Sequence, residues 1–184
     1  MDVDEQFRSK KCVTNNKEYT MKKQGFTLIE LMVVIVIMGI LAAVAVPKLF
    51  GMIAKSKASE VPTAAGSYIN MQDAFALERN ALGNWIEIGY SAPGKRDASN
   101  TSKYTSENFT YTGAAPTGTA KTLAAGWKAE NKVKLDACAI GGDWTLNLTL
   151  GSGNNQGNVA YAATTNNADC DGMAPAFKNL ARTL

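Results

Sequence analysis

The sequence predicts an α+β protein in which one long N-terminal α-helix packs on a C-terminal antiparallel β-sheet. Three patterns support this fold class. Residues 26–46 are almost entirely apolar, residues 48–79 carry apolar side chains at helical spacing, and residues 144–150 alternate strictly between apolar and polar. An amphipathic helix can cover the buried face of such a sheet, so these elements predict two packed layers.

The apolar segment 26–46 is long enough to cross a membrane. Only Thr27, Glu30 and Gly39 interrupt it, and at about 1.5 Å per residue a helix of this length spans roughly 30 Å, the thickness of the hydrocarbon core. A chain in lipid must satisfy its own backbone hydrogen bonds, so the segment should be helical despite its β-branched residues.

Glu30 is the unusual residue of this segment. A carboxylate in an apolar span costs about 2.5–3.5 kcal/mol on insertion scales, and such residues usually have a partner and a function. Alternatively, Glu30 lies only one turn from the polar flank, where its side chain can reach water and complement the positive helix N-terminus. Composition alone favours neither interpretation.

The residues in front of the span favour a functional role for Glu30. The stretch 21–25, Met-Lys-Lys-Gln-Gly, is followed at once by Phe-Thr-Leu-Ile-Glu. A secretory signal peptide would place its cleavage site after the apolar core, whereas the plausible processing point here precedes it. This combination of basic leader, glycine, glutamate at a fixed offset and long apolar run resembles the type IV prepilin family, which is related to the pseudopilins of type II secretion. The resemblance covers roughly residues 21–80.

The resemblance implies roles for individual residues. A membrane-bound prepilin peptidase and methyltransferase would cut after Gly25 and N-methylate Phe26, and Glu30 would serve in assembly. Gly39 and Pro47 stand where family members commonly carry residues that loosen the helix. The implied partners are further copies of the subunit and the pilus assembly machinery of the inner membrane. Before assembly the C-terminal domain would lie in the periplasm, and afterwards the protein would form an extracellular filament.

The sequence divides into five expected parts. The first is a leader over 1–25, with Met21 as an alternative start. The helix follows in two halves, a hydrophobic transmembrane and polymerisation half over 26–47 and an amphipathic half over 48–79. A helix–sheet loop over 80–107 then leads to the sheet with its disulfide-bonded C-terminal region over 108–184. Without the leader, basic and acidic residues nearly balance. Bulk charge therefore gives no reason to expect a specific nucleic-acid partner.

Two prolines should shape the helix. Pro47 and Pro62 each remove one backbone donor and free the carbonyl four residues earlier, on Ala43 and Ala58. A helix over 26–79 is therefore expected to bend into an S.

The remaining segments predict a loop and a sheet of three or four strands. Apolar anchors should hold the loop over 80–104 to the domain: Trp85, Ile86, Ile88 and Tyr90. The strand at 144–150 should pair with one at 133–137 through a turn at 141–143, and a third strand should follow at 159–163. Shorter apolar runs at 109–111 and 123–127 would add an edge.

Cys138 and Cys170 form an even pair in a domain that would be exported to an oxidising compartment, so a disulfide is expected. Closing a loop of about 33 residues would stabilise the fold by roughly 3–4 kcal/mol. Near Cys170, residues 167–172 resemble the first half of a calcium loop through Asp169 and Asp171, but Lys178 stands where a ligand glutamate is expected. A polar turn is favoured there, and no metal or other cofactor is predicted.

An enzyme is not expected, because the chain contains no histidine and no glycine-rich phosphate loop. The resemblance instead predicts a structural subunit of a type IV pilus, with surface functions such as adhesion or twitching motility. In the filament Glu30 of one subunit would neutralise the amine of Phe26 on a neighbour. Two alternatives are a pseudopilin of a type II secretion system and a membrane-anchored periplasmic binding module.

Overall fold

The long helix and the sheet are both present in the computed structural model of the chain, which describes residues 25–117 and 120–184. The expected leader falls almost wholly on residues 1–24, which lie outside the described residues. The chain divides into two compact units between Leu41 and Ala42, and the first helix contributes residues to both.

Two α-helices follow one another with a single-residue interruption. α1 covers Leu28–Ala58 and α2 covers Glu60–Arg79. Ser59, between them, keeps helical dihedral angles of φ −64° and ψ −16°. The interruption falls where Pro62, in the first turn of α2, provides no N–H for the carbonyl of Ala58. α1 remains helical on both sides of Pro47. The bends expected at Pro47 and Pro62 stay a prediction.

Six strands form one antiparallel sheet in the order β1-β2-β3-β4-β5-β6. They are β1 Lys95–Arg96, β2 Lys103–Thr105, β3 Phe109–Thr112, β4 Thr122–Asn131, β5 Asp143–Leu150 and β6 Val159–Thr165. Each strand pairs with the next along the chain. The expected number of three or four strands was too low, because β1 and β2 lie within the segment 80–107 that was expected to be a loop.

The prediction of a strand at 133–137 is wrong, and so is the prediction that this segment forms a hairpin with 144–150. β5 pairs instead with β4, and 123–127 belongs to this inner strand rather than to an edge. The sequence pattern of β4 is interrupted by a β-bulge. The register with β5 shifts between Leu123 and Trp127, and Ala125 has a φ of 50°. The bulged N–H of Ala125 donates to Asn147 Oδ1 at 2.8 Å. A bulge breaks the alternation on which strand prediction depends.

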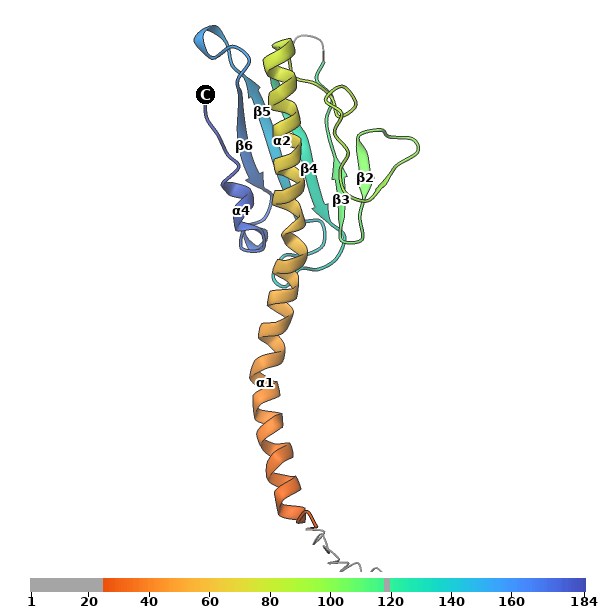
Figure 1. The fold of residues 1–184 in the computed structure, drawn as a ribbon, viewed down its shortest axis with the longest axis vertical. Helices are drawn as coiled ribbons and strands as arrows, with labels where there is room; N and C mark the ends of the chain where they lie inside the picture. Colours follow the sequence, from red (N-terminus) through yellow and green to blue (C-terminus); the bar gives the residue numbers. More distant parts are fainter. Residues whose placement is uncertain (1–24, 118–119) are drawn as a thin grey trace, which may run out of the picture. The chain divides into compact units, whose positions relative to one another are not determined.

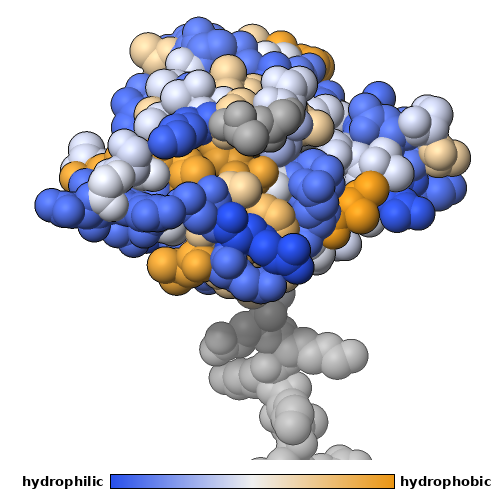
Figure 2. Space-filling view, turned by 90° about the horizontal axis from the view of Figure 1, so that it is seen from above, coloured by the Kyte–Doolittle hydropathy of each residue, from blue (hydrophilic) through white to orange (hydrophobic). Residues whose placement is uncertain are grey.

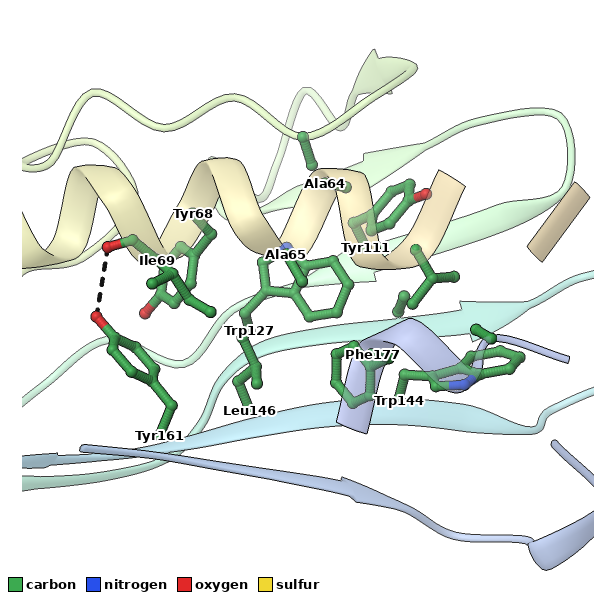
Figure 3. Packing of buried hydrophobic residues seen from close by; sticks show 14 of the residues in the cluster. Ala64, Ala65, Tyr68, Ile69, Tyr111, Trp127, Trp144, Leu146, Tyr161 and Phe177 are labelled. Carbon is green, nitrogen blue, oxygen red and sulfur yellow. Dashed lines mark hydrogen bonds between the residues drawn. The ribbon is translucent and has the colours of Figure 1, made fainter. Parts of the chain in front are cut away.

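α2 covers one face of the sheet (Figure 1). Three of its seven buried residues are alanines, and its buried face packs against large aromatic side chains of the strands (Figure 3). The fully buried residues of this layer include Val61, Ala65, Tyr68, Tyr111, Trp127, Trp144 and Phe177. α2 therefore covers the sheet with its buried face, whereas the bounds 48–79 of the amphipathic half stay a prediction.

The loop after α2 is held by hydrogen bonds as well as by burial. The Trp85 indole N–H donates to the Gly126 carbonyl at 2.9 Å. The Tyr90 hydroxyl accepts from the Trp127 indole at 2.9 Å and donates to the Ala64 carbonyl at 3.0 Å. Trp85 and Tyr90 are thus the anchors that the sequence predicted. Ile86 is not, because it is 62% exposed.

The C-terminal region closes the sheet unit. Two short helices, α3 Ala168–Asp171 and α4 Pro175–Lys178, follow β6, and a 3₁₀ turn, η1 Gly153–Asn155, joins β5 to β6. Cys138, in the β4–β5 loop, forms the predicted disulfide with Cys170 in α3, and both residues are fully buried. The surface in Figure 2 is mostly hydrophilic with scattered hydrophobic patches, as expected for a face in water.

Candidate assembly site at the start of the long helix

Thr27 and Glu30 close the first turn of α1. The backbone N–H and the hydroxyl of Thr27 each donate to Glu30 Oε2 at 2.9 Å. In return, the backbone N–H of Glu30 donates to Thr27 Oγ1 at 3.3 Å. This reciprocal pair is a capping box, which satisfies donors that a helix N-terminus otherwise leaves without partners. Glu30 therefore has a local partner within its own chain.

Thr27 was not identified as a site residue from the sequence. Its signal was present, because Thr-x-x-Glu in front of an apolar run is the pattern of a capping box. A helix that is expected to begin at Phe26 places Thr27 inside the first turn, where a capping residue is not expected. In the structure, residues 25–27 precede the helix.

Phe26 and Glu30 lie on the same stripe of the chain's N-terminal end. With Ile29, Val33 and Val34 they line one shallow hollow of about 350 Å³. Phe26 is 83% exposed, and an added Cβ on Gly25 would meet no atom within 4 Å. The carboxylate thus lies in an open apolar stripe, next to the residue expected to become the new N-terminus.

Apolar side chains along α1 are exposed far beyond this first turn. Every residue from Leu28 to Phe50 is exposed, and within α1 burial begins only at Ala54. One helix of the described chain is long and apolar enough to cross a membrane by length and composition, with a mean hydropathy of 2.9 in its most apolar window and no part of that window buried. Within the same exposed stretch, a Cβ added to Gly39 would also meet open space. Water is a poor environment for such a surface, so lipid or other apolar helices must cover it.

Comparison with known proteins identifies this N-terminal segment. Residues 20–46 match the family model of the prokaryotic N-terminal methylation motif. The chain is 41% identical over 71 residues to the type IV major pilin protein PilA of Myxococcus xanthus (strain DK1622), a match that covers 38% of this chain and 32% of that protein. The N-terminal part of the chain is therefore similar to that of type IV major pilins.

Other relatives match the chain over shorter lengths. The type IV major fimbrial protein FimA of Dichelobacter nodosus is 39% identical over 69 residues, which is 38% of this chain and 44% of that protein. The fimbrial protein EcpC of Eikenella corrodens is 54% identical over 44 residues, or 24% and 29% of the two chains. The chain thus covers between 29% and 44% of the length of these curated relatives. No solved structure shows significant similarity to it.

The second candidate site of the chain, around Asp169 and Asp171, is occupied by the protein's own groups. Asp171 Oδ2 accepts from Lys178 Nζ at 2.6 Å, and Oδ1 accepts from the Thr165 hydroxyl. The Lys178 hydrogen bond, aided by that of Thr165, lowers the pKa of Asp171. Across residues 25–117 and 120–184, no group of three or more His, Cys, Asp or Glu residues is arranged to hold a metal ion. The cation at this turn is Lys178.

Proposed function

We propose that this protein is a type IV pilin, the structural subunit of a type IV pilus filament, cleaved after Gly25, N-methylated at Phe26 and assembled through the apolar surface of α1. The observation that carries the proposal is the combination of a long, uncovered apolar helix with a single carboxylate at its start. The similarity to type IV major pilins and the methylation motif at residues 20–46 support it.

The exposed helix explains why one protein can belong first to a membrane and then to a filament. Before assembly, lipid covers the apolar side chains from Leu28 onward. In a bundle of subunits, the helices of other copies cover the same side chains, and their packing then replaces contacts with lipid tails. The surface that anchors the monomer is therefore also the surface that builds the polymer.

Glu30 gives this packing a preferred register. Its capping partner Thr27 is neutral, so the hydrogen bonds within the chain leave the negative charge of Glu30 without a counter-charge. Cleavage after Gly25 would create a positive amine on Phe26. Pairing that amine with Glu30 of a neighbouring subunit would remove much of the cost of an uncompensated charge among apolar helices.

The proposal includes the partners and locations that this path needs. A prepilin peptidase and methyltransferase would process the leader 1–25, and assembly machinery in the inner membrane would extract the subunit. The part of the chain that follows 26–47 would lie in the periplasm before assembly and outside the cell afterwards. The layout then assigns 48–79 to the sheet cover, 80–107 to a connecting segment that includes the strands β1 and β2, and 108–184 to the rest of the sheet with its disulfide.

Two substitutions separate processing from assembly. Gly25→Val should block loss of the leader, whereas Glu30→Ala should be processed normally and yield no filaments. The matched control is Glu78→Ala, because Glu78 is an exposed acid whose partner is the adjacent Arg79. N-terminal sequencing and electron microscopy of surface appendages give the two readouts.

Three results would count against the proposal. Normal filament yield from Glu30→Ala would remove the assembly role, and a mature N-terminus other than Phe26 would remove the cleavage role. Filaments that stay within the cell envelope and accompany protein secretion would favour the pseudopilin alternative.

A further inference from the structure

A groove lies between the second half of α1 and the β4–β5 loop. It measures about 310 Å³ and is lined by Phe50, Ile53, Ala54, Lys57, Lys134 and Asp136. Figure 1 shows the loop beside the helix below the sheet. All of these residues belong to the unit that begins at Ala42.

The β4–β5 loop approaches α1 through a tight turn. The backbones of Leu135 and Cys138 exchange two hydrogen bonds, at 3.0 and 2.9 Å, and the turn between them places Asp136 at a φ of 51°. Asp136 lies against the helix at Gly51, where an added Cβ would be 3.6 Å from Asp136 Oδ2. Cys138 is also fixed by its disulfide. The wall of the groove is therefore held in place by the fold.

The groove combines an apolar floor with a positive rim. Phe50 is 64% and Ile53 is 43% exposed, although both face a folded domain. Lys57 and Lys134 are exposed above them and outnumber the single acid, Asp136. Apolar side chains below two ammonium groups match the chemistry of a phospholipid, in which acyl chains adjoin a phosphate.

The position of the groove along α1 matches the edge of a bilayer. A placement that keeps Glu30 at one interface needs roughly 20 helical residues to cross the hydrocarbon core, which brings Phe50 to the opposite boundary. Ile53 and Lys57 then fall in the headgroup layer and at its outer edge. The apolar residues that precede the groove, such as Val44 and Leu49, are 74% and 54% exposed and continue the lipid-facing surface into it.

We propose that this groove, between residues 50–57 of α1 and the β4–β5 loop, binds anionic phospholipid of the membrane that anchors the pilin. Phosphate groups contact Lys57 and Lys134, and the glycerol and first methylenes lie on Phe50 and Ile53. The bound lipid holds the sheet unit at the membrane surface, and extraction into a filament must release it. The inference rests on the membrane anchoring included in the proposed function.

The test uses the full chain, one copy per nanodisc, in discs of phosphatidylcholine alone or mixed with phosphatidylglycerol. Hydrogen exchange followed by mass spectrometry reports on 132–140 and on 50–57. Anionic discs should slow exchange in both segments. The factor by which they slow it should fall by about fivefold for each lysine neutralised, so the double variant Lys57→Gln/Lys134→Gln should lose the protection. Lys95→Gln/Lys121→Gln is the matched control, because Lys95 and Lys121 are exposed lysines outside the groove, and it should behave as the unmodified chain.

Additional measurements separate the possible failures. Rapid exchange over 31–46 in both kinds of disc would mean that the chain does not insert, which overturns the anchoring. Slow exchange over 31–46 with equal exchange of 132–140 in both kinds of disc would overturn the lipid site alone. Equal protection by inorganic phosphate in detergent, or protection only in discs with several copies, would assign the groove to a free anion or to a second subunit and would also overturn it. Unchanged exchange in β5 confirms that the variants are folded.

Discussion

Glu30 Oε2 lies 2.9 Å from both the backbone nitrogen and the hydroxyl oxygen of Thr27. The side chain that the sequence marks as anomalous is thus also a helix cap. A loss of function after substitution could then arise from the lost charge or from the lost cap, and the two causes need to be separated.

Glu30→Gln separates them. The glutamine amide oxygen can accept the same hydrogen bonds from Thr27 but carries no charge. We expect Glu30→Gln to give as few filaments as Glu30→Ala, with the leader removed in both, as measured by microscopy and N-terminal sequencing. Filament formation restored by glutamine would show that capping, rather than charge pairing, is the requirement.

Arg182 should fasten the C-terminal segment to α2. Its guanidinium contacts both carboxylate oxygens of Asp73 at 2.7 and 2.8 Å and lies 5.2 Å from the centre of the Tyr161 ring. We expect a double-mutant cycle of Asp73→Ala and Arg182→Ala to give a coupling of about 1 kcal/mol, because the pair is well aligned but partly exposed. Denaturant unfolding followed by tryptophan fluorescence measures it. Strictly additive effects would show that the pair contributes nothing.

Gly142 should be required for the disulfide. A Cβ at this position would lie 2.4 Å from Cys170 Sγ and 2.6 Å from Cys138 Sγ. We expect Gly142→Ala to destabilise the fold by about 1–3 kcal/mol through overpacking, and by roughly 3–4 kcal/mol where the disulfide fails to form. Thiol labelling and denaturant unfolding of the leader-free chain measure both effects. Gly172→Ala is the control, since its Cβ would meet no atom within 4 Å, and equal effects of the two substitutions would contradict the prediction.

Buried tyrosines should make the fold sensitive to alkali. Burial is the main cause that raises the pKa of Tyr68, Tyr90, Tyr111 and Tyr161, and hydrogen bonds to Glu60 and Asp73 add to it for Tyr111 and Tyr161. The unfolded chain loses these protons near pH 10 and the folded chain at higher pH, so stability is full below about pH 10 and falls above it, by up to about 1.4 kcal/mol per pH unit for each tyrosine.

Absorbance of tyrosinate against pH, with unfolding measured in parallel, checks the alkaline prediction. The buried tyrosines should ionise together with unfolding. Tyr161→Phe should reduce the slope of stability against pH by one proton. Gradual ionisation of all tyrosines in a chain that stays folded would contradict the assignment.

Asp171 should give a small effect at acid pH. Its pKa is lowered by Lys178 and then by Thr165, so its contribution is present above the unfolded value of about 3.9 and is lost as the pH falls through the lower folded value. We expect Asp171→Asn to cost up to about 1 kcal/mol near neutral pH, because the Asp171–Lys178 pair is partly exposed. Unfolding curves from neutral to strongly acid pH should show the difference closing below about pH 4. A difference that persists at pH values where both states are protonated would point to a different cause.

The elements with an uninterrupted local pattern could be predicted from the sequence. The apolar run from Phe26, the helical spacing up to Arg79 and the alternation before Leu150 are each properties of one element, and each element is present in the described chain. Trp85 and Tyr90 were predictable as anchors because large aromatic side chains in a loop gain most from burial. The disulfide was predictable from the pair of cysteines in a domain that the sequence predicts to be exported.

Only the tertiary structure decided which segments meet. β4 is the partner of β5 although its alternation is broken, and at the bulge the Ala125 N–H donates to Asn147 Oδ1 across the sheet. The tertiary structure also decided that Lys178 pairs with Asp171 and that Phe50 and Lys134 line one groove. The sequence by itself determined an apolar helix with one charge at its start, since periodicity and hydropathy act along a single segment. Strand pairing and surface grooves depend on contacts between residues far apart in the chain, which no local pattern records.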